Sequence, residues 1–174
     1  VQVQVQGDVL VEDDETFQLV LSDPTNAALA AGSATGTIQN DEATPSLSIG
    51  SVSVGEGNSG STPATFTVVL STASAHAVTV KYATSGATAT SGVDFTAASG
   101  TLTFAPGQTS KTITIDVLGD LLDEDDETFK VTLSSPTNAV ISDGEASGTI
   151  LDDDAAPTIS IGDATATEGD AGTV

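Results

Sequence analysis

Residues 119–129 read GDLLDEDDETF, and residues 7–17 read GDVLVEDDETF. The two stretches lie 112 positions apart (119 − 7). The same offset places residues 1–62 on 113–174 without a gap, with almost half of the pairs identical. Self-similarity of this kind is the signature of tandem repeats. A unit of this size is also long enough to form a domain by itself.

The offset divides the chain into three parts. It predicts the last part of one repeat at 1–42, a complete repeat at 43–154 and the first part of a third repeat at 155–174. Since the chain begins and ends within a repeat, we expect it to be a portion of a longer protein.

The complete repeat has the hydrophobic pattern of short strands. Large apolar residues alternate with Ser, Thr and Ala, as in strands with one buried face. The runs contain Leu47/Ile49, Val52/Val54, Phe66/Val68/Leu70, Val78/Val80/Tyr82, Leu102/Phe104, Ile113/Ile115/Val117, Phe129/Val131/Leu133 and Ala146/Ile150. Turn signals rich in Gly, Pro, Asn and Ser separate them, and no helical period is present. About seven strands in a unit of this length predict an all-β, antiparallel β-sandwich.

Composition excludes several classes of protein. Lys+Arg total 3 against 25 Asp+Glu, which gives a formal net charge of −22. Such a chain repels nucleic acid and anionic membrane surfaces, so we expect neither as a partner. Cysteine is absent, which rules out disulfides and thiolate metal sites. High charge with few aromatics also occurs in disordered chains. Here, however, 38% of residues are hydrophobic and lie in alternating runs, which favours a folded protein.

The acidic residues concentrate where the predicted strands end. In the complete repeat most of them lie at Glu56, Asp94, Asp120, residues 123–127 and residues 152–154. Alternate strand ends of a sandwich lie at one pole, where gathered carboxylates would repel each other strongly. Binding of Ca²⁺, which takes six to eight oxygen ligands from flexible loops, is the simplest way to offset this repulsion. Solvated charge or adaptation to salt is the alternative. The repeat favours ligands, because positions 8 and 12–15 keep their acids while 9 and 11 vary.

Five motifs resemble the Calx-β domain. They are VGEG at 54–57, GVDF at 92–95, FAPG at 104–107, the run 120–129 and ILDDD at 150–154. The likeness follows the 112-residue repeat over essentially the whole chain. It implies an all-β fold of immunoglobulin-like antiparallel β-sandwich repeats in tandem, each binding a small cluster of Ca²⁺ ions at one end.

The resemblance also implies a set of metal ligands. In the complete repeat they are Glu56, Asp94, Asp120, the main-chain carbonyl of Leu122, Glu124, Glu127, Asp152, Asp153 and Asp154. Their counterparts are Asp8, Glu12, Glu15, Asn40, Asp41 and Glu42 in the first repeat and Glu168 in the third. Asp123, Asp125 and Asp126 are expected to be solvated neighbours. Thr90 stands where some members carry an acid, so one peripheral ion site is expected to be weaker or missing.

The function predicted is a calcium-binding structural module of a large secreted or cell-surface protein, such as an adhesin or an extracellular fibre. Its expected partners are the neighbouring repeats of the same chain, with possible homotypic filament assembly and an adhesive target that the sequence does not identify. Two alternatives stay open: a calcium-sensing regulatory domain of a membrane transporter, and a calcium-independent acidic spacer. We expect no enzyme, because the chain has one His (His76), one Tyr (Tyr82) and no nucleophile–base pair. His76 is expected to lie in a loop and face solvent.

Overall fold

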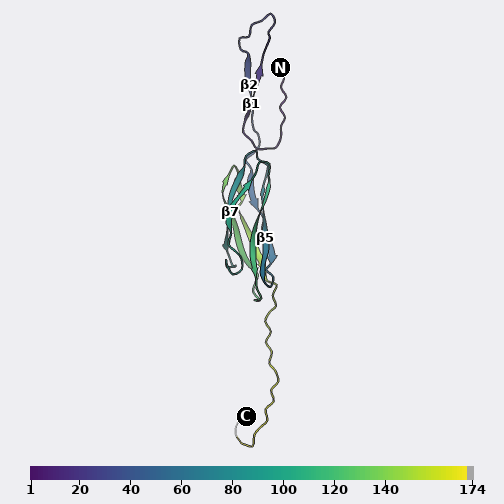
Figure 1. The fold of residues 1–174 in the computed structure, drawn as a ribbon, viewed down its shortest axis with the longest axis vertical. Coiled ribbons are helices and arrows are strands. Elements are labelled where there is room, and N and C mark those ends of the chain that lie inside the picture. Colours follow the sequence, from purple (N-terminus) through teal and green to yellow (C-terminus); the bar gives the residue numbers. More distant parts are fainter. Residues whose placement is uncertain (172–174) are drawn as a thin grey trace.

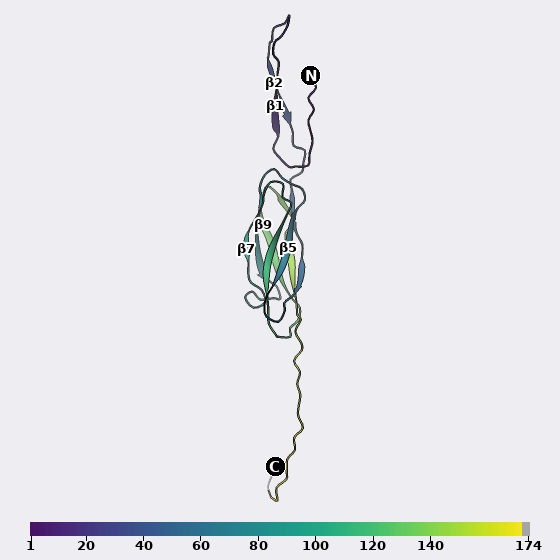
Figure 2. The ribbon, with the colours of Figure 1, turned by 45° about the vertical axis from the view of Figure 1, so that its right-hand side comes forward.

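The computed structural model describes residues 1–171, which form an elongated molecule (Figure 1). A hairpin of β1 (Glu15–Val20) and β2 (Ser33–Ile38) lies at one end. A β-sandwich formed by the complete repeat occupies the middle, and the segment after it extends from the opposite end (Figure 2). The hairpin and the segment after the sandwich therefore lie at opposite ends of it.

Two sheets form the sandwich. One has the strand order β10-β3-β5-β8 and the other β4-β11-β9-β6-β7. The strands of the first sheet are β3 (Ser46–Ile49), β5 (Gly60–Leu70), β8 (Ser110–Gly119) and β10 (Val140–Asp143). Those of the second are β4 (Val52–Gly55), β6 (Val78–Gly86), β7 (Ser99–Phe104), β9 (Glu127–Thr137) and β11 (Glu145–Leu151).

Alternate residues of these strands fill the space between the sheets. In β5, for example, Ala64, Phe66, Val68 and Leu70 are buried while the residues between them are exposed. The largest fully buried side chains are Phe66, Phe95, Phe104 and Phe129. The core thus confirms the two-residue hydrophobic period as the signal of a half-buried strand.

The hairpin at the end of the molecule repeats a piece of the sandwich. Shifted by 112 residues, β1 and β2 fall on the paired strands β9 and β11. Phe17 lies opposite Gly36, just as Phe129 lies opposite Gly148. A Cβ atom on either glycine would collide with the facing ring, so the absence of a side chain lets the aromatic ring cover the neighbouring strand.

Some features differ from the expected pattern. β10 is short and has a single half-buried residue, Ile141, so its hydrophobic period is too brief to read from sequence. The edge strands β10 and β4 pair in parallel with β3 and β11, whereas all other pairings are antiparallel. The expected first strand of the third repeat, at Ile159 and Ile161, is fully exposed and forms no strand.

The described residues also contain no helix long and apolar enough to span a bilayer.

Candidate metal centre

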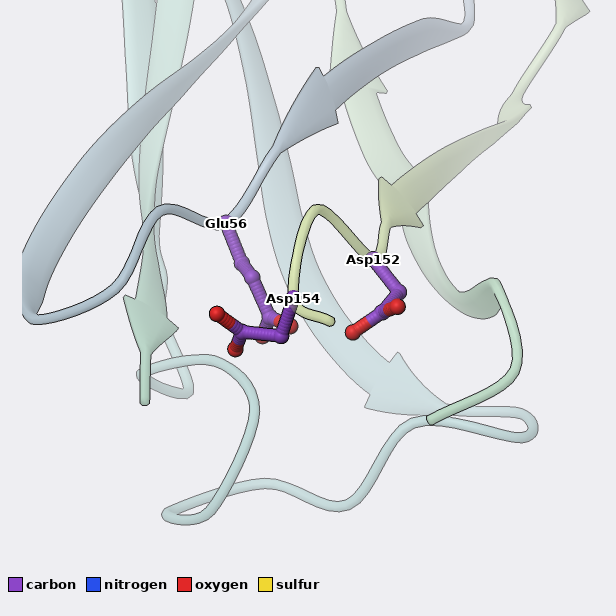
Figure 3. Close-up of side chains that lie close together, drawn as sticks. All are labelled: Glu56, Asp152 and Asp154. Atoms are coloured by element: carbon purple, nitrogen blue, oxygen red, sulfur yellow. The ribbon is translucent and has the colours of Figure 1, made fainter. Parts of the chain in front are cut away.

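Glu56, Asp152 and Asp154 form the first group of carboxylates, cluster A (Figure 3). Each offers an oxygen within 4.8 Å of the others. The parallel pairing of β4 and β11 explains the cluster, because it brings the carboxyl ends of both strands to the same place. Glu56 follows β4, and its amide continues the ladder by donating to the carbonyl of Leu151 at 3.2 Å. Only 4% of Glu56 is exposed to solvent.

Asp94, Glu124 and Glu127 form the second group, cluster B, whose oxygens also lie within 4.8 Å of one another. Asp94 is buried in the loop between β6 and β7. Its carbonyl accepts from the amide of Leu118 at 2.9 Å, and its carboxylate accepts from the amide of Thr90 at 2.6 Å. Glu127 is the first residue of β9, and Glu124 lies in the acidic loop before it. The loop before β7 and the residues at the start of β9 are far apart in sequence. They thus bring their carboxylates together around a space that one ion could fill.

The electrostatics of the two clusters are those of crowded, partly desolvated acids. Burial raises the pKa of Glu56 from 4.5 to about 7, and the charge of Asp120 adds to the rise. Burial and a hydrogen bond with Asp94 raise the pKa of Glu127 from 4.5 to about 7. The pKa of Glu124 is also raised, first by burial and then by Asp120. Desolvation and like charge both disfavour the ionised form, so the site favours protons or cations.

Two carboxylate oxygens of cluster A have no hydrogen-bond partner among the described residues. They are Oδ1 of Asp152 and Oδ2 of Asp154, and both are shielded from solvent. Burial raises the pKa of Asp154, whereas a hydrogen bond from Asn58 lowers it. Buried polar atoms are almost always paired, so orphaned acceptors indicate a missing positive partner.

The donor set fits Ca²⁺. All six side chains offer carboxylate oxygen, and hard cations prefer oxygen over nitrogen and sulfur. Ca²⁺–oxygen distances of about 2.3–2.6 Å place ligands on opposite sides of an ion about 5 Å apart. The oxygens of each cluster lie within 4.8 Å of one another, close enough to bind one such ion together.

Of the nine ligands expected in the complete repeat, the structure gathers six into the two clusters. Asp120 belongs to neither cluster but is close enough to raise the pKa of both Glu56 and Glu124. Leu122 has an exposed side chain, and its amide donates to Oδ1 of Asp120 at 2.7 Å. Asp153 lies beside Gly55 rather than in either cluster.

The ligands expected in the partial repeats lie apart from these clusters. One hollow beside the hairpin is lined by all six expected residues of the first repeat, Asp8, Glu12, Glu15, Asn40, Asp41 and Glu42. Glu168 is exposed in the segment after β11.

Three residues that were not expected to be ligands also shape the site. Asn58 donates to Asp154, and Oγ1 of Thr62 donates to the carbonyl of Glu56 at 2.9 Å. Asp126 is exposed and lies outside both clusters, and its Oδ1 also accepts from the amide of Asp152 at 3.2 Å. Asp14 holds the amide of Asn40 in the same way at 3.0 Å, and the 112-residue offset relates the two pairs.

Comparison with known proteins identifies the class. The Calx-beta domain family model matches residues 1–43 and 39–154. The chain therefore belongs to the Calx-beta domain family, which confirms the resemblance seen in its motifs.

Solved structures agree with this assignment. The apo-form Calx CBD1 domain is 28% identical, with a TM-score of 0.58, and the match covers 64% of this chain and 100% of that one. CBD12 from CALX1.2 is 29% identical, with a TM-score of 0.57, over 63% of this chain and 46% of that one. The calcium binding domain CBD12 of CALX1.1 is 28% identical, with a TM-score of 0.56, over 62% and 46%. This chain thus spans about half the length of the two CBD12 chains.

Proposed function

We propose that the complete repeat is a calcium-binding structural module in which Ca²⁺ holds together one end of the sandwich. The observation that carries this proposal is the pair of buried, unpartnered oxygens of Asp152 and Asp154 beside the buried carboxylate of Glu56. Clusters A and B would hold the ions, with Asp120 between them, and the residues around the hollow of the first repeat would hold their counterparts. The similar structure of CBD12 from CALX1.1 is that of a calcium binding domain, which supports the choice of ion.

The position of cluster A suggests a mechanical role. Asp152 and Asp154 lie where the chain leaves β11 and passes toward residues 155–171 (Figure 3). An ion held by these carboxylates fixes the first residues of the connection as well as the loops. Metal binding free energy then contributes both to folding and to the stiffness of the chain between repeats.

The repeat organisation and the setting belong to the same proposal. We take 1–42, 43–154 and 155–174 as parts of three successive repeats in a secreted or cell-surface protein. In that setting, calcium-stiffened repeats would act as an adhesin stalk or extracellular fibre with neighbouring repeats as partners. A near-complete lack of basic residues and the 112-residue repetition support this reading.

A regulatory calcium-sensing domain is the second candidate. The likeness to Calx CBD1 and CBD12 structures favours it. The two candidates differ in what calcium does. A sensor releases and rebinds ions over a working range and changes shape, whereas a structural module stays loaded and gains mainly stability.

Calorimetric titration of Ca²⁺ into the chelator-treated chain, with thermal melts alongside, tests the proposal. We expect several ions to bind and the melting temperature to rise. Glu124→Ala should remove most of both effects, whereas Asp143→Asn, an exposed acid outside both clusters, should change neither. A chain that binds no calcium would leave the acidic-spacer reading in place.

A further inference from the structure

The acidic loop of the first repeat is seated on the complete repeat through main-chain atoms. Val11 forms a parallel β-bridge with Ser74. Its amide donates to the carbonyl of Ala73 at 3.1 Å, and its carbonyl accepts from the amide of Ala75 at 2.8 Å. Oγ1 of Thr72 donates to the carbonyl of Val9 at 3.0 Å. We call residues 9–13 the docking loop and residues 72–76 the receiving edge.

Hydrogen bonds within the complete repeat also hold the receiving edge in place. Ser74 is buried, with 3% of its surface exposed. Its carbonyl accepts from the amide of Gly107 at 2.9 Å, and its Oγ accepts from the amide of His76 at 3.0 Å. Both bonds lie within the complete repeat, and the small side chains of the edge let another backbone approach closely.

Docking through the main chain explains how the repeats vary. Positions 9 and 11 are Val and Val in the first repeat but Leu121 and Asp123 in the second. Strand addition of this type takes its affinity from backbone hydrogen bonds and tolerates side-chain changes. The loop side chain that does face the edge is Asp13, whose Oδ1 lies 3.5 Å from Nε2 of His76. That position is also acidic in the second repeat, as Asp125.

The corresponding loop of the complete repeat has the same form. Oδ1 of Asp120 accepts from the amide of Leu122 at 2.7 Å, and Oδ1 of Asp8 accepts from the amide of Leu10 at 2.8 Å. The side chains at the next position are equally exposed, 73% for Leu121 and 75% for Val9.

We propose that residues 72–76 are a receiving edge for the acidic loop of the preceding repeat, and that residues 121–125 dock in the same way on the receiving edge of a further copy of this repeat. Asp13 and Asp125 then act as junction residues that face the following repeat's histidine, while the acids around them serve the metal clusters. Each junction then has a fixed direction, because the acidic end of one repeat contacts the uncharged end of the next.

Amide hydrogen exchange of chain 1–174 in saturating calcium tests the first junction. The amide of Ala75 should exchange at least about tenfold faster in Val11→Pro, which removes the donor to Ala73 and disturbs the bridge. Val11→Asp, which copies Asp123, should leave the exchange of Ala75 unchanged. Core amides of β9 should be unaffected in both variants, because Val11 lies outside the complete repeat. Equal exchange of Ala75 in the original chain and Val11→Pro would overturn the proposal.

The contact between Asp13 and His76 has its own pair of variants. His76→Glu places like charge opposite the docking loop and should speed exchange of the Ala75 amide, whereas Ala77→Glu adds the same charge at an exposed neighbouring position and should not. Equal effects of the two variants would show that Asp13 does not face the edge in solution.

The second junction is tested by extending the chain. A second copy of residues 43–154 placed directly after Asp154 supplies a receiving edge in phase with the repeat. The amide of Asp123 should then exchange about tenfold more slowly than in chain 1–174, and His76→Glu in the added copy alone should reverse this. Unchanged exchange of Asp123 would show that the docking seen at Val11 does not recur.

Discussion

The rings of Phe95 and Phe129 stack with their centroids 4.6 Å apart and their planes 16° from parallel. Each ring lies close in sequence to a ligand of cluster B. Asp94 immediately precedes Phe95, and Glu127 lies two residues before Phe129 on the same face of β9. A bridge between Phe95 and Val117 fixes the other side of the loop. The hydrophobic core therefore positions the carboxylates of cluster B.

Phe95→Ala is expected to weaken calcium binding as well as the fold. Removing a fully buried Phe costs about 3–5 kcal/mol of unfolding free energy, and here it also frees the loop that carries Asp94. Phe104→Ala is the matched control, because Phe104 is equally buried but pairs with Val78 at the far end of β6. Melts with calorimetric titration should show similar destabilisation in both variants and a loss of calcium affinity in Phe95→Ala alone. Equal affinities would mean that the stack does not position the site.

Glu56 and Glu127 make the stability of the calcium-free chain depend on pH. Their folded-state pKa of about 7 lies above the ordinary 4.5, so the folded state binds more protons than the unfolded state between these values. The contribution of these groups to the free energy of unfolding is fully present below pH 4.5 and is lost as the pH rises through about 7. We expect the melting temperature in chelator to fall between pH 5 and pH 8.

Calcium should change that profile. Because ions bind the deprotonated carboxylates, binding should release protons and should reduce or reverse the fall in melting temperature. Titrations in buffers of different ionisation enthalpy measure the release directly. Glu56→Gln should flatten the profile in chelator. A melting temperature in chelator that rises from pH 5 to pH 8 would contradict the electrostatics described for clusters A and B.

The sequence predicts the fold more completely than the site, for a physical reason. A strand with one buried face can be recognised from its own sequence, because apolar residues such as Phe66, Val68 and Leu70 recur at every second position. Cluster membership depends on which strand ends meet, and nothing local to Glu56 shows that β4 runs parallel to β11. The resemblance named the acidic segments, but their separation into two clusters is seen only in the structure. The hydrogen bonds of Asn58 and Asp126 with the Asp154 and Asp152 segment likewise depend on contacts between distant loops.

Asp152→Asn tests whether repulsion within cluster A is the cost that calcium relieves. The first repeat carries Asn40 at this position, and Oδ1 of Asn40 accepts from the amide of Glu12 at 3.0 Å. The substitution removes one charge that raises the pKa of Glu56. It should raise the melting temperature in chelator while lowering calcium affinity. Asp143→Asn removes the same charge outside the clusters and should do neither. An Asp152→Asn chain that is less stable in chelator would show that the carboxylate is satisfied without an ion.

Gly119→Ala should disrupt cluster A without removing a ligand. A Cβ atom on Gly119 would collide with the carbonyl of Gly57 and lie 2.7 Å from the carbonyl of Glu56, and both are backbone atoms that cannot rotate away. The loop that carries Glu56 must therefore shift, and ligand geometry is lost with it. Gly50→Ala is the control, since a Cβ there meets nothing within 4 Å. Calorimetric titration should show calcium affinity falling in Gly119→Ala and unchanged in Gly50→Ala. Retained affinity in Gly119→Ala would mean that the position of the Glu56 loop does not govern binding.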